Sequence, residues 1–293
     1  MCIIEPDIER IESTRIFARN DGYHQFLAYQ MIFETEQPVA MILPVPVALP
    51  ARDDSLRFVN LEGQQDLLWR LARTIPSPFV PAFFRTFGNQ VDDVVTAQPL
   101  EVQHVGSYVA TFVPSLADFD RVPREFRLPD AFWRDIARYQ DWGFAVFQLQ
   151  PHADPQEIEP MAFVFETRYP DRLFFPTLHR HDGNVAAWEY FDHILLAQGL
   201  ELGPRPRLTR EDVERYDRQK PYFSFWYPPE NAEGWADTIK PLKAFDLALP
   251  DSLAGAIDAE EEVFLKVLRG NFPNEDHWAH VTNPGCRMSA TGH

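Results

Sequence analysis

The chain has 293 residues, of which 45% are hydrophobic and 14% aromatic, so it is long and apolar enough to bury a substantial core. Its 44 acidic residues outnumber 27 basic residues, and the formal net charge of −17 argues against nucleic acid and anionic membranes as partners. Two cysteines are too few for a disulfide framework. We therefore expect an acidic globular protein whose partner is a small molecule or a peptide.

The first ten residues, MCIIEPDIER, lack the basic and apolar regions of a signal peptide. No run of residues approaches the ~18 consecutive apolar residues that a membrane-spanning helix needs. These features predict a cytoplasmic protein, in which both cysteines are kept as thiols by the reducing compartment.

Three apolar or alternating runs near the N-terminus predict β-strands: STRIFAR (13–19), QFLAYQMIFET (25–35) and VAMILPVPV (39–47). The turn sequences NDG and EQP separate them. Together they predict a three-strand meander.

The same pattern recurs later in the chain. FETEQPVAMILP (33–44) aligns without a gap to FETRYPDRLFFP (165–176), with five identical positions. We therefore predict that residues 12–47 and 144–179 form two copies of one meander, in which Pro44 is equivalent to Pro176.

Helix signals flank these strands. QQDLLWRLARTI (64–75), PDAFWRDIARYQDWG (129–143) and DAEEEVFLKVLRG (258–270) have the helical spacing or the start and stop residues of helices. The predicted fold class is α+β, a mostly antiparallel sheet built from two related three-strand meanders with flanking helices. We expect a duplicated core over residues 1–200, followed by a C-terminal helical and aromatic loop segment (201–293) that packs on the core.

The segment FFPTLHRHDG (174–183) contains two histidines two residues apart, His179 and His181. On a strand they point to one face, which allows two imidazoles to share a metal ion. Pairing around the RYPD turn sets His179 opposite Ala162 and brings the loop PHADPQEIEP (151–160) to the same edge. This predicts a zinc or iron site, and possible further ligands in the loop are His152, Asp154, Glu157 and Glu159.

Two other histidine-containing segments are interpreted differently. His193 is expected outside the metal site, whether the residues after Gly183 form a hairpin strand or a helix. The segment with His277 and His280 near the C-terminus is interpreted as a surface segment.

An alternative chemistry starts from Cys2. If Met1 is removed, a free amine lies beside a thiol, as in N-terminal nucleophile amidohydrolases. FARND (17–21) is similar to the segment that follows the nucleophilic cysteine in choloylglycine-type hydrolases. That resemblance implies Cys2 as nucleophile, with Arg19 and Asp21 holding the substrate or the amine.

A third alternative is a non-catalytic binding or interaction protein. The sequence contains no phosphate loop, dinucleotide fingerprint, Gly-x-Ser-x-Gly elbow or paired-cysteine zinc motif, which disfavours kinases, Rossmann enzymes and the usual serine hydrolases. Three function classes therefore remain open.

Several segments also resemble a family of uncharacterised bacterial proteins. Besides the Met-Cys start, they are MILPVP (41–46), VGSYVATFVPSLADF (105–119), YQDWGFAVFQL (139–149) and EPMAFVFETRYPDRLFFPT (159–177). Related secreted proteins share the Leu-Pro-Val-Pro strand end and the Val-Gly-x-Tyr segment. The resemblance covers about the first two-thirds of the chain and implies one shared fold, with no activity to carry over.

Overall fold

The structure is a computed structural model of the chain, and it describes residues 2–5, 10–73, 100–123, 137–180, 185–200, 235–236, 253, 255–258, 261 and 263–281. Within these ranges the chain is rich in β-structure and has few, short helices. The helices are α1 (Leu67–Arg73) and the 3-10 helices η1 (Leu116–Arg121) and η3 (Ala137–Tyr139).

Sixteen strands are distributed along the described part of the chain. They are β1 (Cys2–Glu5), β2 (Arg10–Asn20), β3 (His24–Thr35), β4 (Val39–Val45), β5 (Leu56–Val59), β6 (Val102–Val105), β7 (Tyr108–Val113), β8 (Gly143–Leu149), β9 (His152–Glu157), β10 (Met161–Glu166), β11 (Arg172–Phe175), β12 (His179–Arg180), β13 (Trp188–Ala197), β14 (Trp235–Ala236), β15 (Phe264–Pro273) and β16 (His277–His280).

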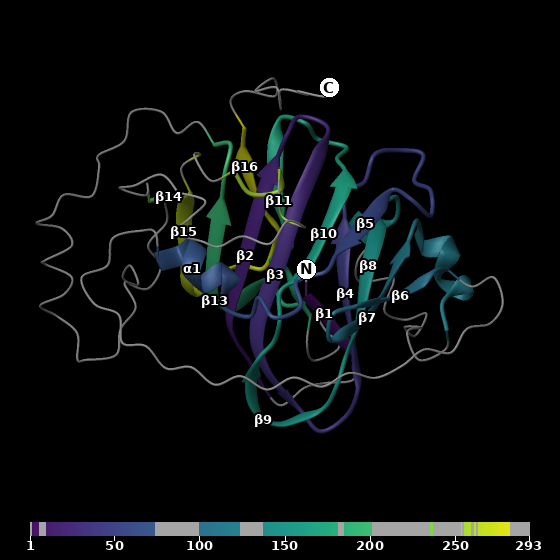
Figure 1. Cartoon of the computed structure of the whole chain (residues 1–293), viewed down its shortest axis with the longest axis horizontal. Helices are drawn as coiled ribbons and strands as arrows, with labels where there is room; N and C mark the ends of the chain where they lie inside the picture. The colour runs from purple at the N-terminus through teal and green to yellow at the C-terminus, as the bar shows by residue number, and fades with distance from the viewer. Residues whose placement is uncertain are drawn as a thin grey trace, which may run out of the picture.

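These strands assemble into sheets whose order differs from the order in the sequence. One sheet has the order β12-β1-β4-β8-β7-β6, and a larger one has the order β14-β15-β13-β2-β3-β10-β5, with β9 also pairing with β3. β11 and β16 form a two-stranded sheet. In Figure 1, β2 and β3 run side by side through the middle of the molecule, with β13 and β15 on one side and β4, β8, β7 and β6 on the other.

The main hydrophobic core lies between the six-stranded and the eight-stranded sheets. Phe147 of β8 contacts Phe163 of β10, with ring centroids 6.3 Å apart, and Phe58 of β5, with centroids 5.4 Å apart. All residues of β4 are buried, as expected for an apolar strand covered on both faces. The two sheets are held together mainly by the burial of these apolar side chains.

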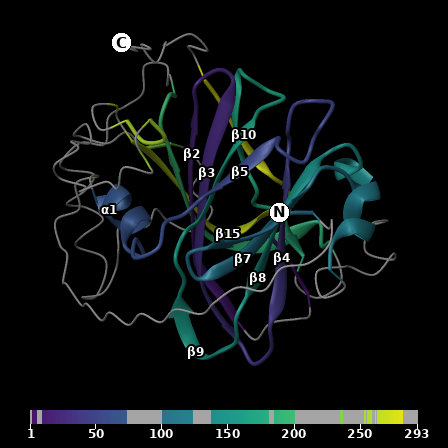
Figure 2. The ribbon, with the colours of Figure 1, turned by 45° about the vertical axis from the view of Figure 1, so that its right-hand side comes forward.

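A second hydrophobic cluster covers the opposite face of the eight-stranded sheet. There Leu67, Leu68 and Leu71 of α1 pack with side chains of the sheet, including Phe17 and Leu265. Figure 2 shows α1 on the side of β2 and β3 that faces away from β4, β7 and β8. We call this side the outer face of the eight-stranded sheet.

The α+β prediction with two related meanders is wrong, because the fold is β-rich and the two segments are arranged differently. In the first segment β2 pairs with β3 as a hairpin, and β4 belongs to the other sheet. In the second segment β8 lies in the six-stranded sheet, β10 lies between β3 and β5, and β11 pairs with β16. Similar local turn and strand sequences therefore occur in different long-range pairings.

The predicted helices have different outcomes. The first is confirmed by α1, which begins three residues after the predicted start at residue 64. Most of the second lies outside the described ranges, and its described part contains the 3-10 helix η3. The third is wrong, since residues 264–273 form strand β15, paired antiparallel with β13 over ten residue pairs. No helix in the described ranges is both long enough and apolar enough to cross a membrane.

Candidate functional site: a polar pocket on the outer face of the eight-stranded sheet

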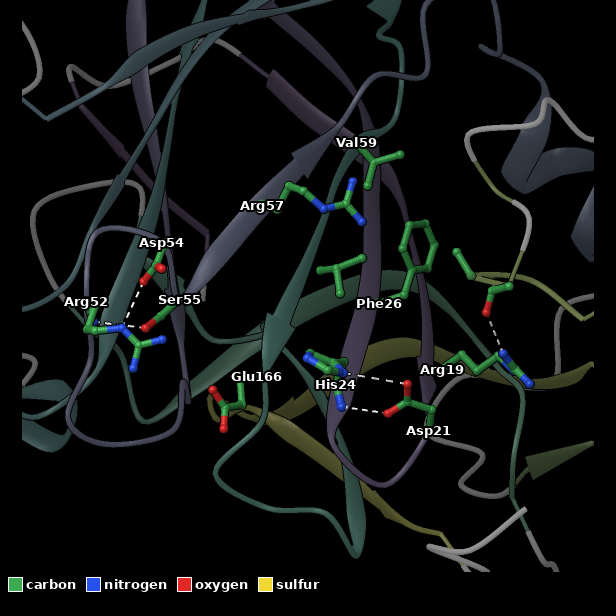
Figure 3. A pocket seen from close by; sticks show the side chains of 13 residues that line it. Arg19, Asp21, His24, Phe26, Arg52, Asp54, Ser55, Arg57, Val59 and Glu166 are labelled. Atoms are coloured by element: carbon green, nitrogen blue, oxygen red, sulfur yellow. Dashed lines mark hydrogen bonds and ion pairs between the residues drawn. The ribbon is translucent and has the colours of Figure 1, made fainter. Parts of the chain in front are cut away.

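A pocket of about 500 Å³ lies on the outer face, near the ends of β2, β3, β5 and β10 (Figure 3). The part of the outer face that α1 covers is apolar, whereas the part that lines this pocket carries several charged side chains. The lining residues are Arg19, Asp21, His24, Phe26, Arg52, Asp54, Ser55, Arg57, Val59, Val164, Glu166, Gly255 and Ala256. We call it the polar pocket.

Strand register explains why the central residues of the polar pocket meet. Val164 of β10 is the register partner of Arg57 in β5 and of Phe26 in β3, and Phe26 is the partner of Arg19 in β2. Register partners on neighbouring strands point to the same face of a sheet. A row of four side chains therefore crosses the pocket, with an arginine at each end and two apolar residues between them.

A second row follows two residues further along the strands. Glu166 of β10 pairs with His24 of β3, and its backbone N–H donates to the carbonyl of Ser55 beside β5. Asp21 completes the row, because its backbone N–H donates to the His24 carbonyl. The second row is polar throughout and borders the apolar middle of the first.

The turn between β2 and β3 is built by side chains of the predicted NDG sequence. The Asn20 Oδ1 accepts a hydrogen bond from the Gly22 N–H at 2.7 Å, and the Asp21 Oδ1 accepts from the N–H groups of Tyr23 and His24. Gly22 has a φ of 93°, a conformation that side-chain-bearing residues rarely adopt. The predicted strands and turn are confirmed here, and they place Asp21 and His24 at the pocket rim.

Arg19 is held in place by residues that precede β15 in the chain. Its Nε lies 3.0 Å from the Glu261 carboxylate, its Nη1 donates to the Gly255 carbonyl at 2.7 Å, and Asp258 lies 3.6 Å away. Arg19 therefore serves as a fixed wall of the pocket, with its charge already compensated.

Other charges of the pocket are paired locally. Arg52 lies 3.0 Å from Asp54, and the His24 Nδ1 lies 3.7 Å from Asp21. By contrast, no side-chain hydrogen bond or ion pair within the described ranges involves Arg57 or Glu166, and no dashed line reaches them in Figure 3. Among the described residues, the pocket thus offers one uncompensated positive and one uncompensated negative charge, on adjacent strands.

The predicted site residues at the polar pocket are Arg19 and Asp21, although they were predicted for cysteine chemistry. Cys2 lies in β1 of the six-stranded sheet, where its backbone is the register partner of His179. Arg19 and Asp21 line a pocket on the outer face of the other sheet. The role of Cys2 as a nucleophile stays a prediction.

The position predicted for His193 is wrong. Its Nε2 lies 3.0 Å from the Nε2 of His179, and both rings are buried. β12 and β13 form neither a hairpin nor a strand followed by a helix, because β12 pairs with β1 and β13 with β2 and β15. The two histidines meet because their strands belong to the two sheets that face each other.

The register predicted for the metal site is also wrong, since Ala162 pairs with Ala28 and Val59 and not with His179. The predicted carboxylates have other partners. Glu157 forms an ion pair with Arg15, and Glu159 accepts hydrogen bonds from the N–H of Gly63 and from the hydroxyl of Ser107.

His181 lies outside the described residues, as do the side chains of His152 and Asp154. Within the ranges given above, no group of three or more His, Cys, Asp or Glu side chains is placed to hold a metal ion. The zinc or iron site stays a prediction.

No protein-family model and no curated protein sequence matches the chain. Among solved structures, it is similar to a mutated baculovirus P35 after caspase cleavage, with a TM-score of 0.42 and 12% identity over 92% of this chain and 99% of that chain. A chain of a caspase-8/P35 complex has a TM-score of 0.41 and 12% identity over 92% of this chain and 96% of that one. TM-scores this low do not establish a shared fold.

Arg57 and Glu166 are not among the site residues predicted from the sequence. Arg57 lies between the buried residues Leu56 and Phe58, an alternation that is typical of a half-exposed strand. Glu166 ends the apolar run of β10. These signals could have marked both residues as exposed strand positions, but their proximity depends on the pairing of β5 with β10.

Proposed function

We propose that the chain is a non-catalytic binding protein that holds a small zwitterionic molecule, of the class of free amino acids and short peptides, in the polar pocket. The observation that carries the proposal is the pair of opposite charges on Arg57 and Glu166, for which the described part of the chain provides no side-chain partner. Both residues are exposed to solvent and line the same pocket.

The geometry of the two charges suits such a ligand. Arg57 and Glu166 are diagonal neighbours on adjacent strands, a relationship that separates the two backbone positions by about 7 to 8 Å. Their charged groups lie apart in the pocket, so a ligand that reaches both needs its own charges at separate ends (Figure 3). A guanidinium binds a carboxylate through two parallel hydrogen bonds, whereas a carboxylate accepts hydrogen bonds from an ammonium group. One ligand with both groups would compensate both side chains.

The remaining lining supports a ligand with an apolar portion. Phe26 and Val164 lie between the two arginines of the first row, and they offer the apolar floor that ligand pockets commonly have. The volume of about 500 Å³ is within the range of small-molecule sites. Glu166 and Asp21 disfavour a ligand that carries only negative charge.

The test is isothermal titration calorimetry on the purified full chain with three probes that share a carbon skeleton. L-leucine carries both charged groups, 4-methylpentanoate lacks the amine, and isoamylamine lacks the carboxylate. We expect L-leucine to bind at least tenfold more tightly than either single-charge probe. Equal or weaker binding of L-leucine would overturn the zwitterion assignment.

Substitutions of the two charged residues test whether L-leucine binds in the polar pocket. Arg57→Gln and Glu166→Gln should each weaken L-leucine binding at least tenfold, because each removes one charge that the ligand compensates. Arg172→Gln is the matched control, since Arg172 is an arginine on strand β11 that pairs with Asp171 and does not line the pocket. Binding that is unchanged in both pocket variants would place the ligand elsewhere and contradict the proposal.

As a second candidate function we propose metal binding at His179 and His193. Support comes from their Nε2 atoms, which lie 3.0 Å apart, close to the spacing of two nitrogens on one zinc ion. A metal ion would replace the proton that the two nitrogens share, so binding would weaken as the pH falls. His181, two residues beyond His179, stays the predicted further ligand.

Titration of the purified chain with Zn²⁺ and with Fe²⁺ tests this candidate. His193→Phe should abolish binding, whereas His280→Phe, which changes an exposed histidine on β16, should not. Identical metal binding by the wild type and His193→Phe, or no binding by the wild type, would exclude the histidine pair as a metal site.

A further inference from the structure

A second hollow, of about 490 Å³, lies where η3 approaches β15 and the turn before β16. Its lining combines aromatic rings with charged groups of both signs, and none of its residues lines the polar pocket. The lining residues are Arg138, Tyr139, Trp142, Lys266, Glu275, Asp276, His277 and Trp278. We call it the aromatic pocket.

Trp278 supplies an exposed ring that its neighbours hold in position. Its side chain is 38% exposed, although Trp is a residue that proteins usually bury. Its ring centroid lies 4.9 Å from that of Phe174, 5.3 Å from Tyr169 and 6.2 Å from Trp142. The indole is therefore a pre-positioned and partly exposed apolar surface in the lining of the aromatic pocket.

The hydrogen bonds of Thr177 determine the tautomer of His277. The Thr177 hydroxyl has a single proton, which it donates to the Glu275 carbonyl at 2.8 Å, so its oxygen accepts from the His277 Nδ1–H at 2.8 Å. The Nε2 of His277 then carries a lone pair. Burial, and secondarily the charge of Lys266, lower the pKa of His277 to about 4, so this nitrogen remains an acceptor at neutral pH.

The turn that carries the acidic residues is also fixed. Asp276 accepts hydrogen bonds from the Tyr139 hydroxyl and, at 3.1 Å, from the Leu178 N–H. These contacts join η3, the residue before β12 and the turn before β16. The lining residues come from three separate parts of the chain, 138–142, 266 and 275–278, and the hydrogen bonds of Asp276 fix two of these parts to one another and to the core, which favours a preformed site.

Charges in the aromatic pocket balance. Arg138 and Lys266 contribute two positive charges, Glu275 and Asp276 contribute two negative charges, and His277 is neutral. The lining therefore offers donors and acceptors without favouring a charged ligand of either sign. An apolar ring beside many polar groups suits a molecule with one apolar face and several hydroxyls.

We propose that the aromatic pocket is a binding site for a neutral carbohydrate of one or two sugar rings. The C–H face of a sugar would lie on the Trp278 ring, and its hydroxyls would bond to Arg138, Lys266, Glu275 and His277. This site goes beyond the proposed amino-acid pocket and is independent of it.

Saturation-transfer difference NMR on the full chain tests the proposal, with D-glucose, D-galactose, N-acetylglucosamine, maltose and lactose as probes. We expect at least one sugar to show transfer to its ring protons. Trp278→Ala should abolish the transfer or weaken binding at least tenfold. Trp188→Ala is the matched control, because Trp188 is 63% exposed, lies on β13 and does not line the pocket.

Choline is included as a cationic probe. Three outcomes would overturn the proposal: no transfer to any of these sugars, transfer that Trp278→Ala leaves unchanged, or transfer to choline and not to the sugars. Choline would show that the aromatic rings select a cation. Arg57→Gln should leave sugar binding unchanged and weaken only L-leucine binding, so the two sites can fail or succeed separately.

Discussion

The Nε2 atoms of His179 and His193 lie 3.0 Å apart, with one histidine on the edge strand β12 of the six-stranded sheet and the other on the interior strand β13 of the eight-stranded sheet. At this distance one nitrogen donates a proton and the other accepts it. The His179 ring also stacks on Phe191, with centroids 4.6 Å apart. The pair is therefore a buried polar contact that joins the two sheets, next to Asn274, whose side chain bonds to the backbone N–H and carbonyl of His179.

His193→Phe should lower the free energy of unfolding by about 1 to 2 kcal/mol, because a buried imidazole of His179 would face an apolar ring in place of its hydrogen-bond partner. Urea unfolding of the metal-free protein measures the change. His24→Phe is the control, since His24 is 53% exposed, and it should change stability by less than about 0.5 kcal/mol. Equal effects of the two substitutions would show that the pair does not stabilise the fold.

Glu159→Gln should destabilise the protein by about 1 to 3 kcal/mol. The Glu159 Oε1 accepts a hydrogen bond from the Gly63 N–H at 2.8 Å, and its Oε2 accepts from the Ser107 hydroxyl at 2.9 Å and from the Ser107 N–H at 3.3 Å. An amide NH₂ would therefore face a backbone N–H at either position. Thermal or urea unfolding measures the effect. Glu166→Gln should be nearly neutral, because Glu166 is exposed and lacks a side-chain partner among the described residues; a loss as large as that of Glu159→Gln would contradict this account.

Gly143→Ala should destabilise the protein by about 1 to 3 kcal/mol through overpacking. A Cβ at this position would lie 2.6 Å from the Phe112 Cζ and 3.2 Å from the Val47 Cγ2. In the double variant with Phe112→Leu, the alanine should cost less than it does alone, since the smaller side chain makes room. Strictly additive losses in urea unfolding would show that the contact with Phe112 is not the cause.

The stability of the protein should depend on pH through His277. Its pKa is about 4 when folded, below the ordinary value of 6.5, so between these values the unfolded state binds more protons and stability rises with pH. The contribution is complete above pH 6.5 and is lost progressively as the pH falls toward 4, by up to about 3 kcal/mol. Urea unfolding at several pH values, compared with His277→Gln, isolates this dependence. A stability difference between the two proteins that stays constant from pH 7 to 4.5 would contradict it.

Local sequence was sufficient for the β2–β3 hairpin and for α1. The side chains of Asn20 and Asp21 bond to the backbone within the turn, and Gly22 accepts the positive φ, so neighbouring residues specify the turn conformation. The Asn20 Nδ2 adds long-range hydrogen bonds, including one to the Arg172 carbonyl at 3.1 Å. The leucines of α1 follow helical spacing on one face. Such features could be predicted because their physical causes lie within a few residues.

In the segment that forms strand β15, the local sequence pattern is compatible with both a helix and a strand. Its residues are apolar on both faces, with Phe264 and Leu268 in the main core and Leu265 and Val267 in the outer cluster. A run that is buried on both sides has no alternation, and its acidic start and basic end also suit a helix. Pairing with β13, more than 60 residues earlier, decided the outcome.

The sequence by itself determined the acidic, globular character of the chain, its early strands and the turn that carries Asp21. Only the tertiary structure decided that Arg57 and Glu166 border the same pocket and that His193 meets His179. The physical reason is that the spacing of apolar residues in the sequence indicates which face of a strand is buried, but it does not indicate which strand lies beside it. Which strands pair depends on the total apolar surface that both sheets bury. That pairing brings the residues of each site together.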